Sequence, residues 1–188
     1  MPLPTLSTAR LKLVPLQLAD AEQIQPLFAH WEVVRYLNSQ VPWPYPADGA
    51  LSYLRDVALP AMAAGSEWHW TLRPADDRER IIGVVSLMDT PGNNRGFWLA
   101  PAWQRQGLMG EACVAVNRYW FEVLKRPLMR VPKAVANVAS QRISEREGMR
   151  LVETGESDYV CGRLPSQIWE LSREEWLSQQ ACPLTGLI

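Results

Sequence analysis

The spacing of hydrophobic residues along the chain predicts alternating strands and helices. Leu11 and Leu13 alternate with polar neighbours and Pro15 follows them, so residues 10–16 predict an edge strand, where proline is tolerated. Residues 81–88 are apolar almost without interruption, which is typical of a central strand. Further strands are expected at residues 68–72, 96–100, 130–136, 151–160 and 167–171.

Apolar residues at every third or fourth position predict the helices. The clearest helix covers residues 107–125, where Cys113, Val116 and Trp120 share one face. Another helix is expected to begin after Asn137, a typical N-cap residue, and to end at Gly148. Further helices are expected at residues 21–29, 31–37, 47–64 and 173–180.

The order of these elements predicts an α/β fold. One strand is followed by two or three helices, three strands, a helix, a strand, a helix and two strands. Consecutive strands usually pair as neighbours, and a strand–helix–strand step gives a parallel pair. We therefore expect a mixed, mostly antiparallel sheet whose parallel pair lies near Phe97 and Val131. A length of 188 residues predicts a single domain over residues 1–188.

Composition narrows the possible partners. The formal net charge is −1, so the chain lacks the broad positive field with which proteins bind nucleic acid or acidic membranes. No apolar run approaches the roughly 18 residues that a membrane span needs, and the first ten residues do not resemble a signal peptide. We expect neither a nucleic-acid partner nor a membrane partner.

Cysteine and histidine are too few and too scattered for a disulfide framework or a metal centre. Cys113, Cys161 and Cys182 are far apart and odd in number, which predicts a reducing, cytoplasmic location. His30 and His69 have no other ligands placed beside them, so no metal site is expected. His69 alternates with two tryptophans on a predicted strand, and we expect a structural rather than a catalytic histidine.

The most informative stretch is residues 96–112, which predicts a strand, a short loop and a helix start that carries Gly107 and Gly110. A helix start has unpaired N–H groups and a partial positive charge, and glycine lets a ligand approach the backbone closely. Such a turn suits a pyrophosphate, and Arg105 would add a direct charge. An ordinary helix start with two glycines is the alternative.

This stretch resembles the acyl-CoA loop of the GNAT superfamily, whose pattern is Gln/Arg-x-x-Gly-x-Gly/Ala. Gln104 and Gly107 match, whereas Met109 stands where glycine or alanine is usual, and its side chain would either crowd the pyrophosphate or enter the core. The resemblance implies that the loop binds acetyl-CoA, with coenzyme A held by Gln104, Arg105, Gln106, Gly107, Met109 and Gly110. It also implies that backbone groups of Phe97, Trp98 and Leu99 bond the pantetheine arm.

A second segment, residues 137–149, resembles the Asn-x-x-Ser…Glu-x-x-Gly-Phe motif of the RimJ/RimL-like, ribosomal-protein N-acetyltransferase branch, with Met149 in place of phenylalanine. The resemblance implies that Asn137 bonds the pantetheine or acceptor end, that Ser140 lies near the thioester sulfur, and that Arg142 reaches a CoA phosphate. Helix capping is the alternative role for Asn137 and Ser140. The implied GNAT fold has six or seven strands with a central splayed parallel pair.

The resemblance implies direct attack of a primary amine on acetyl-CoA, with much of the rate due to positioning. Many GNAT enzymes have an acidic tyrosine where this chain has Ser144, so Ser140 is the first candidate to protonate the sulfur. Candidates for the general base are Asp158 and Glu67. Each is alternatively a solvated surface charge.

The acceptor implied by the branch is a protein or peptide N-terminus. An enclosed aromatic pocket would instead favour a small amine such as a polyamine or an antibiotic, and the Trp43–Pro46 loop supplies either such an aromatic wall or ordinary loop packing. A non-catalytic acyl-CoA-binding module is a further alternative. A Rossmann-type nucleotide domain is disfavoured, because the glycine-rich loop follows several strands and no GxGxxG occurs. Exposed tryptophans and the apolar C-terminal end also suggest a homodimer.

Overall fold

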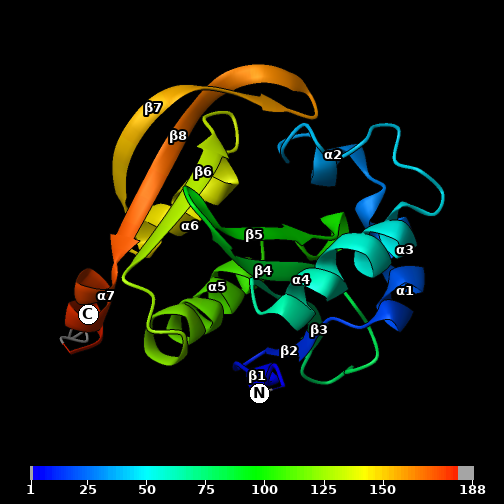
Figure 1. Ribbon diagram of the computed structural model, residues 1–188, viewed down its shortest axis with the longest axis horizontal. Helices are drawn as coiled ribbons and strands as arrows, with labels where there is room; N and C mark the ends of the chain where they lie inside the picture. Colours follow the sequence, from blue (N-terminus) through cyan, green and yellow to red (C-terminus); the bar gives the residue numbers. More distant parts are fainter. Residues whose placement is uncertain (1, 182–188) are drawn as a thin grey trace.

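The structure, a computed structural model, describes residues 2–181 and contains two antiparallel sheets (Figure 1). The first has the order β1-β2-β3-β4-β5 and consists of β1 (Leu6–Ser7), β2 (Leu11–Pro15), β3 (Glu67–Pro74), β4 (Gly83–Thr90) and β5 (Asn93–Leu99). The second has the order β6-β8-β7 and consists of β6 (Leu128–Ala134), β7 (Arg150–Tyr159) and β8 (Gly162–Ser172). The predicted α/β fold is confirmed, and the additional strand is the two-residue β1.

Seven α-helices are described: α1 (Ala21–Phe28), α2 (Trp31–Val34), α3 (Gly49–Tyr53), α4 (Leu59–Ala64), α5 (Leu108–Arg118), α6 (Val138–Arg146) and α7 (Arg173–Ala181). A π-helical segment, Leu54–Ala58, joins α3 to α4, and a second, Tyr119–Val123, extends α5. The long predicted helices therefore exist with one wider turn each. Within residues 2–181 no helix has both the length and the apolarity to cross a bilayer.

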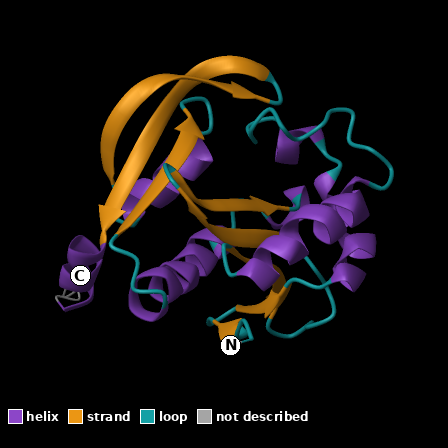
Figure 2. Cartoon of the chain, viewed as in Figure 1, coloured by secondary structure: helices purple, strands orange, loops and turns teal. Residues whose placement is uncertain are grey.

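Alternating side chains give the first sheet two buried faces. Trp70 and Leu72 of β3 pack with Cys113 and Val116 of α5 on one face. Val84 of β4 belongs to the other face, which α1, α3 and α4 cover. Figure 2 shows helices on either side of the strands. Both faces of β4 are covered, as the continuous apolar run at residues 81–88 predicts.

The two sheets meet where β5 and β6 begin together and then diverge. The backbone N–H of Arg130 in β6 donates to Oδ1 of Asn94 in β5 over 2.8 Å. Beyond this contact the strands belong to different sheets. The predicted parallel pair is therefore splayed: the two strands are joined near their start and separate toward Leu99 and Ala134. The open part between these strand ends is called the splay below.

Pro132 helps to keep the splay open. Val135 N–H donates to Pro165 O in the β8 direction over 2.9 Å, so odd-numbered residues of β6 face β8 and even-numbered ones face β5. Pro132 thus occupies the rung after Arg130 on the edge that faces β5. Because proline has no N–H, it cannot donate a ladder bond there.

The β7–β8 hairpin arches over this opening and its tip reaches the segment after α2, as Figure 1 shows. Backbone N–H groups of Val160 and Cys161 donate to Leu37 O and Arg35 O over 3.0 and 3.1 Å, and Ser39 N–H donates to Asp158 O over 3.2 Å. The hairpin is thereby fixed at both ends, although most β7 side chains are exposed.

A buried ion pair ties the splay to the helices beneath it. The guanidinium of Arg95 in β5 donates to both carboxylate oxygens of Glu147 over 2.8 Å, and Asn117 of α5 bonds both partners. The Arg95 side chain is fully buried and that of Glu147 is 5% exposed. Two opposite charges in this geometry hold β5, α5 and the end of α6 together.

We expect Glu147→Gln to lower the free energy of unfolding by about 3–5 kcal/mol, because it leaves the buried Arg95 charge uncompensated. Urea denaturation measures this change. The matched control is Glu156→Gln, which removes the carboxylate from an exposed pair with Arg163 at 3.0 Å and should lower stability far less than Glu147→Gln. Equal effects of the two substitutions would contradict the role given to the buried pair.

Candidate active site

The predicted anion-binding loop lies between the end of β5 and the start of α5. Gly107 directly precedes α5 with φ 77°, a left-handed conformation that glycine adopts without strain. Within residues 2–181 no acceptor is bonded to the N–H groups from Gln106 through Gly110. Five successive donors at a helix start suit the oxygens of a diphosphate.

The N-terminal segment braces this loop. Arg10 donates from its backbone N–H and Nε to the two carboxylate oxygens of Glu111, each over 2.8 Å, and from Nη1 to Gln106 O over 3.0 Å. Burial acts to raise the pKa of Glu111, but hydrogen bonds from Thr8 and Arg10 outweigh it and hold this pKa below its usual range. Glu111 therefore remains charged and keeps the loop attached to the first sheet.

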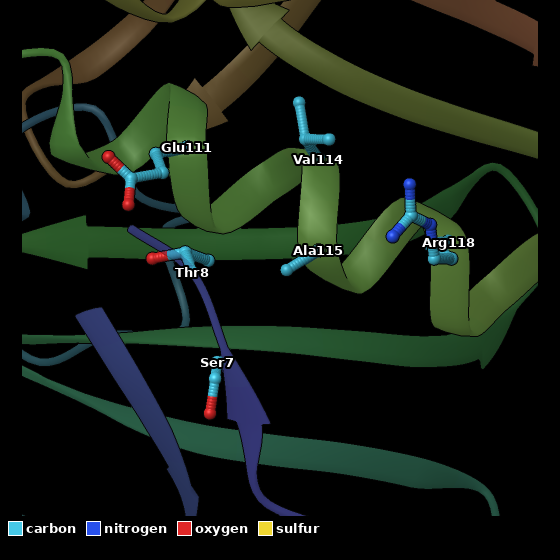
Figure 3. A pocket seen from close by; sticks show the side chains of 6 residues that line it. All are labelled: Ser7, Thr8, Glu111, Val114, Ala115 and Arg118. Carbon is cyan, nitrogen blue, oxygen red and sulfur yellow. The ribbon is translucent and has the colours of Figure 1, made fainter. Parts of the chain in front are cut away.

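An open hollow runs along α5 beside this brace, and Figure 3 shows the side chains around it. Its lining consists of Ser7, Thr8, Glu111, Val114, Ala115 and Arg118. None of these is a predicted cofactor or catalytic residue, so the hollow borders the loop without being part of the predicted site.

Two predicted loop residues have structural contacts. Nε2 of Gln104 donates to Leu99 O over 2.9 Å and holds the loop against the end of β5. The Met109 side chain is buried in the core between the first sheet and α5, which is the second of the two alternatives that the sequence left open. Next to it, a Cβ on Gly110 would meet no atom within 4 Å, so the backbone there is accessible.

The free edge of β5 faces the splay. Ala100 N–H donates to Ile82 O over 2.8 Å, so by strand alternation the backbone groups of Trp98 face β4, whereas those of Phe97 and Leu99 face β6. The Trp98 side chain packs edge-on against Phe28 at 5.3 Å between ring centres.

The second motif begins at the open end of β6. Oδ1 of Asn137 accepts from Ser140 N–H over 3.2 Å, so the predicted helix cap is present. Ser140 is buried, and Arg142 is exposed on the next turn of α6. The structure thus brings Asn137 and Ser140 to the side of the splay that lies opposite Phe97 and Leu99.

Lys133 of β6 lies between the two motifs and was not among the expected site residues. Its Nζ donates to Ser140 Oγ over 2.7 Å and lies 5.4 Å from the centre of the Phe97 ring. Burial, and then the positive charge of Arg95, lower the pKa of Lys133 to about 7. The period of two along β6, with Met129 and Val131 facing inward, is the signal that places Lys133 on the buried face.

On the other face of the first sheet, Glu67 is linked to His69 and Ser86. His69 Nε2 lies 2.6 Å from a carboxylate oxygen of Glu67, and Nδ1 lies 2.6 Å from Ser86 Oγ. Ser86 pairs with Gly96 in β5. The three polar side chains therefore run along this face from β3 to β4, from the partly exposed Glu67 carboxylate toward β5, the strand that lines the splay. Both ring nitrogens of His69 have a hydrogen-bond partner, as expected for a structural histidine. One of these partners, Glu67, is a predicted general base.

A tyrosine hydroxyl lies in the field of the Glu67 carboxylate. Burial of the hydroxyl and the nearby charge of Glu67 raise the pKa of Tyr53 to about 12. Asp158, the other predicted base, is an exposed residue at the hairpin tip, with Arg163 Nη1 3.8 Å from its Oδ1. Within residues 2–181 no hydrogen bond or ion pair joins Asp158 to Ser140 or to Glu67.

The sequence model of the acetyltransferase (GNAT) domain matches residues 10–150, which include both motifs. The chain belongs to the GNAT acetyltransferase family. It is an acyl-CoA-dependent N-acyltransferase whose cofactor is acetyl-CoA, and the predicted family, enzyme class and cofactor are confirmed.

Solved structures share the fold of this GNAT acetyltransferase at low identity, whereas no curated protein matches its sequence. RimL, the ribosomal L7/L12 α-N-protein acetyltransferase in a disulfide-linked complex with coenzyme A, superimposes with a TM-score of 0.77 at 14% identity, covering 92% of this chain and 99% of RimL. The ribosomal-protein-S5-alanine acetyltransferase of Vibrio fischeri gives 0.77 at 13% identity over 92% and 98%. The spermidine N-acetyltransferase SpeG of Vibrio cholerae gives 0.71 at 16% identity over 90% and 98%.

The lowered pKa of Lys133 predicts a pH-dependent stability. The unfolded chain keeps the Lys133 proton up to about pH 10.5, whereas the folded site keeps it only up to about pH 7. Between these values the unfolded state binds more protons, so the free energy of unfolding rises with pH, by up to ~1.4 kcal/mol per pH unit. We expect Lys133→Met to remove this rise and to stabilise the protein most at pH 6.

Denaturation at pH 6, 7, 8 and 9 measures the difference between wild type and Lys133→Met. Lys12→Met is the matched control, because the Lys12 ammonium also donates to a serine hydroxyl, that of Ser7 over 2.8 Å, but at the surface. A difference that stays constant from pH 6 to 9 would show that Lys133 is not held with a lowered pKa.

Proposed function

We propose that this enzyme, as a single cytoplasmic domain over residues 1–188, acetylates the N-terminal amine of a protein or peptide. The observation that carries the proposal is the splay between β5 and β6, because its free backbone edge leads directly to the unpaired donors of the Gln106–Gly110 turn. An extended pantetheine arm fits such an edge as an added strand would, and a diphosphate fits the turn.

The residues present fit acetyl-CoA at both ends. We assign the diphosphate to the backbone of Gln106, Gly107, Met109 and Gly110, with charge from Arg105 and Arg142. Gln104 shapes the loop, Phe97 and Leu99 offer backbone groups to the pantetheine, and Trp98 and Asn137 flank it. When bound, acetyl-CoA supplies an acetyl group activated as a thioester.

Glu67 is the favoured base. Its carboxylate is 22% exposed, so it can reach the cleft, and His69 holds it at 2.6 Å. A carboxylate anchored through a histidine to Ser86 is oriented toward the strand that lines the splay. Asp158 remains the second candidate, on a hairpin tip that residues 37–39 hold in place. Ser140 is the proposed acid that protonates the leaving sulfur.

The assignment of the acceptor rests on the negative charge of the β7–β8 hairpin, which arches over the splay. The exposed carboxylates of Glu153, Glu156 and Asp158 make β7 of this hairpin an acidic strand, which would attract a cationic N-terminus. RimL and the S5-alanine enzyme, with the same fold, act on ribosomal proteins by their names. A small cationic amine is the second candidate, because Phe28, Tyr45 and Trp98 form an aromatic cluster with centroid distances of 4.9 and 5.3 Å.

Two further features extend the proposal to assembly. Trp31 and Trp43 are about two-fifths exposed and pack together at 5.4 Å between ring centres, which offers a surface for a homodimer. The apolar C-terminal end that also suggested a dimer lies outside the described residues.

Release of free thiol from acetyl-CoA, measured with a panel of amines, tests the acceptor. We expect release with peptides that have a free N-terminus and none with the same peptides blocked at that amine. Release with spermidine but not with peptides would move the assignment to a small amine. Clear CoA binding without thiol release for any amine would support a non-catalytic module instead.

Glu67→Gln should bind CoA with unchanged affinity and lose thiol release about 100-fold, as expected for removal of a general base. Asp158→Asn is the matched control, since it removes the competing carboxylate. If Asp158→Asn abolishes release and Glu67→Gln does not, the base is on the hairpin tip.

Gly107→Glu should abolish CoA binding measured by calorimetry, because a carboxylate would stand before the diphosphate and the residue has φ 77°. The matched control is Gly92→Glu, at φ 79° in the β4–β5 turn, where a Cβ meets no atom within 4 Å. Both variants incur the same left-handed strain of about 1 kcal/mol. Wild-type affinity in Gly107→Glu would remove the loop from the cofactor site.

A further inference from the structure

We propose that Lys133 is a positioning residue for acyl transfer: its ammonium holds the Ser140 hydroxyl toward the splay and replaces the proton that Ser140 gives up. The inference rests on the proposed function and on the proposed role of Ser140 as the acid. It adds a residue that belongs to neither sequence motif.

The hydrogen-bond pattern fixes the direction of the Ser140 proton. A lysine ammonium has three donors and no acceptor, so in the 2.7 Å contact Nζ donates and Ser140 Oγ accepts. The hydroxyl hydrogen of Ser140 must then point to a different acceptor. None of the described hydrogen bonds supplies one, so that hydrogen is available to a group placed in the splay.

The ammonium is buried among groups from β5, α5 and α6. The Phe97 ring of β5 lies 5.4 Å from Nζ, and Lys133 is only 5% exposed. The charged and titratable groups that face it are Arg95 of β5, Cys113 of α5 and Glu147 at the end of α6. Burial raises the pKa of Cys113 to about 12, so this thiol stays neutral, and the carboxylate of Glu147 is already bound by Arg95.

Within residues 2–181, Lys133 therefore has no carboxylate partner of its own. A buried ammonium without one is costly, and a methionine of similar length would fill the same space more favourably. The arrangement keeps the proton on Nζ only weakly, with a pKa of about 7. A donor of this strength is matched to proton transfer near neutral pH. An isolated serine hydroxyl is too weak an acid to give up its proton at this pH unless a neighbouring group replaces that proton.

The proton balance follows from these contacts. Ser140 Oγ gives its hydrogen to the leaving sulfur and takes one from Lys133 Nζ, which becomes a neutral amine. Lys133, which is 5% exposed, then regains a proton from solvent. The amine proton leaves on the opposite face of the sheet through Glu67, so the acid and the base are separate groups.

A titration without any cofactor tests the first half of the proposal. The chain has only three lysines, Lys12, Lys125 and Lys133. Carbon-13 labelling of lysine and NMR should show one Cε resonance that titrates near pH 7 and disappears in Lys133→Met. Ser140→Ala should move this midpoint to lower pH, because it removes the acceptor that favours the charged form. A midpoint unchanged by Ser140→Ala would overturn the coupling.

A double-mutant cycle in turnover tests the second half. Lys133→Met should lower kcat about 10- to 100-fold with little change in KM for acetyl-CoA, as expected for loss of assisted proton transfer. The double variant Lys133→Met/Ser140→Ala should be no slower than Ser140→Ala alone, because Lys133 acts through Ser140. Lys12→Met, with its surface Lys–Ser contact, should match wild type.

The pH profile distinguishes this role from its alternatives. Because the charged form is the proton source, kcat of wild type should fall as pH rises above about 7, and this falling limb should be missing in Lys133→Met. A rising limb through pH 7 that Lys133→Met removes would show that Lys133 is a base. Wild-type kcat in Lys133→Met would overturn the inference while leaving the proposed function intact. Absence of thiol release in wild type would contradict the proposed function itself.

Discussion

The divergence of β5 from β6 is the constraint on which the site depends. Asn94 and Arg130 join the two strands at their start, and Pro132 removes the donor that the next rung would need. The free strand edge is therefore a consequence of one side-chain contact and one proline. A closed ladder at this point would leave no backbone groups for a bound pantetheine, and the helix starts on either side would face only protein.

The polar groups beneath the splay have a cost that the apolar core must offset. Arg95 and Glu147 are buried as a bidentate pair supported by Asn117, which satisfies both charges. Lys133 shares that region without a carboxylate of its own, and its contacts are a serine hydroxyl and an aromatic ring. Among the described residues beneath the splay, the Arg95 and Glu147 charges are thus paired, whereas Lys133 lies without a carboxylate partner beside the proposed reacting group.

The first sheet separates the two halves of the proposed chemistry. Lys133 and Ser140 lie on the side of the first sheet that α5 covers, whereas Glu67, His69 and Ser86 lie on the face that α3 and α4 cover. Because strand side chains alternate, neighbouring residues of one strand supply opposite faces. An acid for the leaving sulfur and a base for the attacking amine can therefore act at one acetyl carbon without neutralising each other.

The sequence by itself determined the order of elements, both motifs and the helix boundaries at Gly107 and Gly148, because these depend on local periodicity and on backbone conformation. It also determined the family, because the loop motif needs only a few residues at fixed spacing. The π-helical turns and the extra strand β1 were not predicted, since they depend on packing between distant segments. Only the tertiary structure decided which of the candidate residues meet: it placed Met109 in the core, linked Glu67 to His69, and brought Lys133 to Ser140 across a strand and a helix start. Long-range burial and hydrogen bonding set those neighbours, and no pattern along one segment of the chain records them.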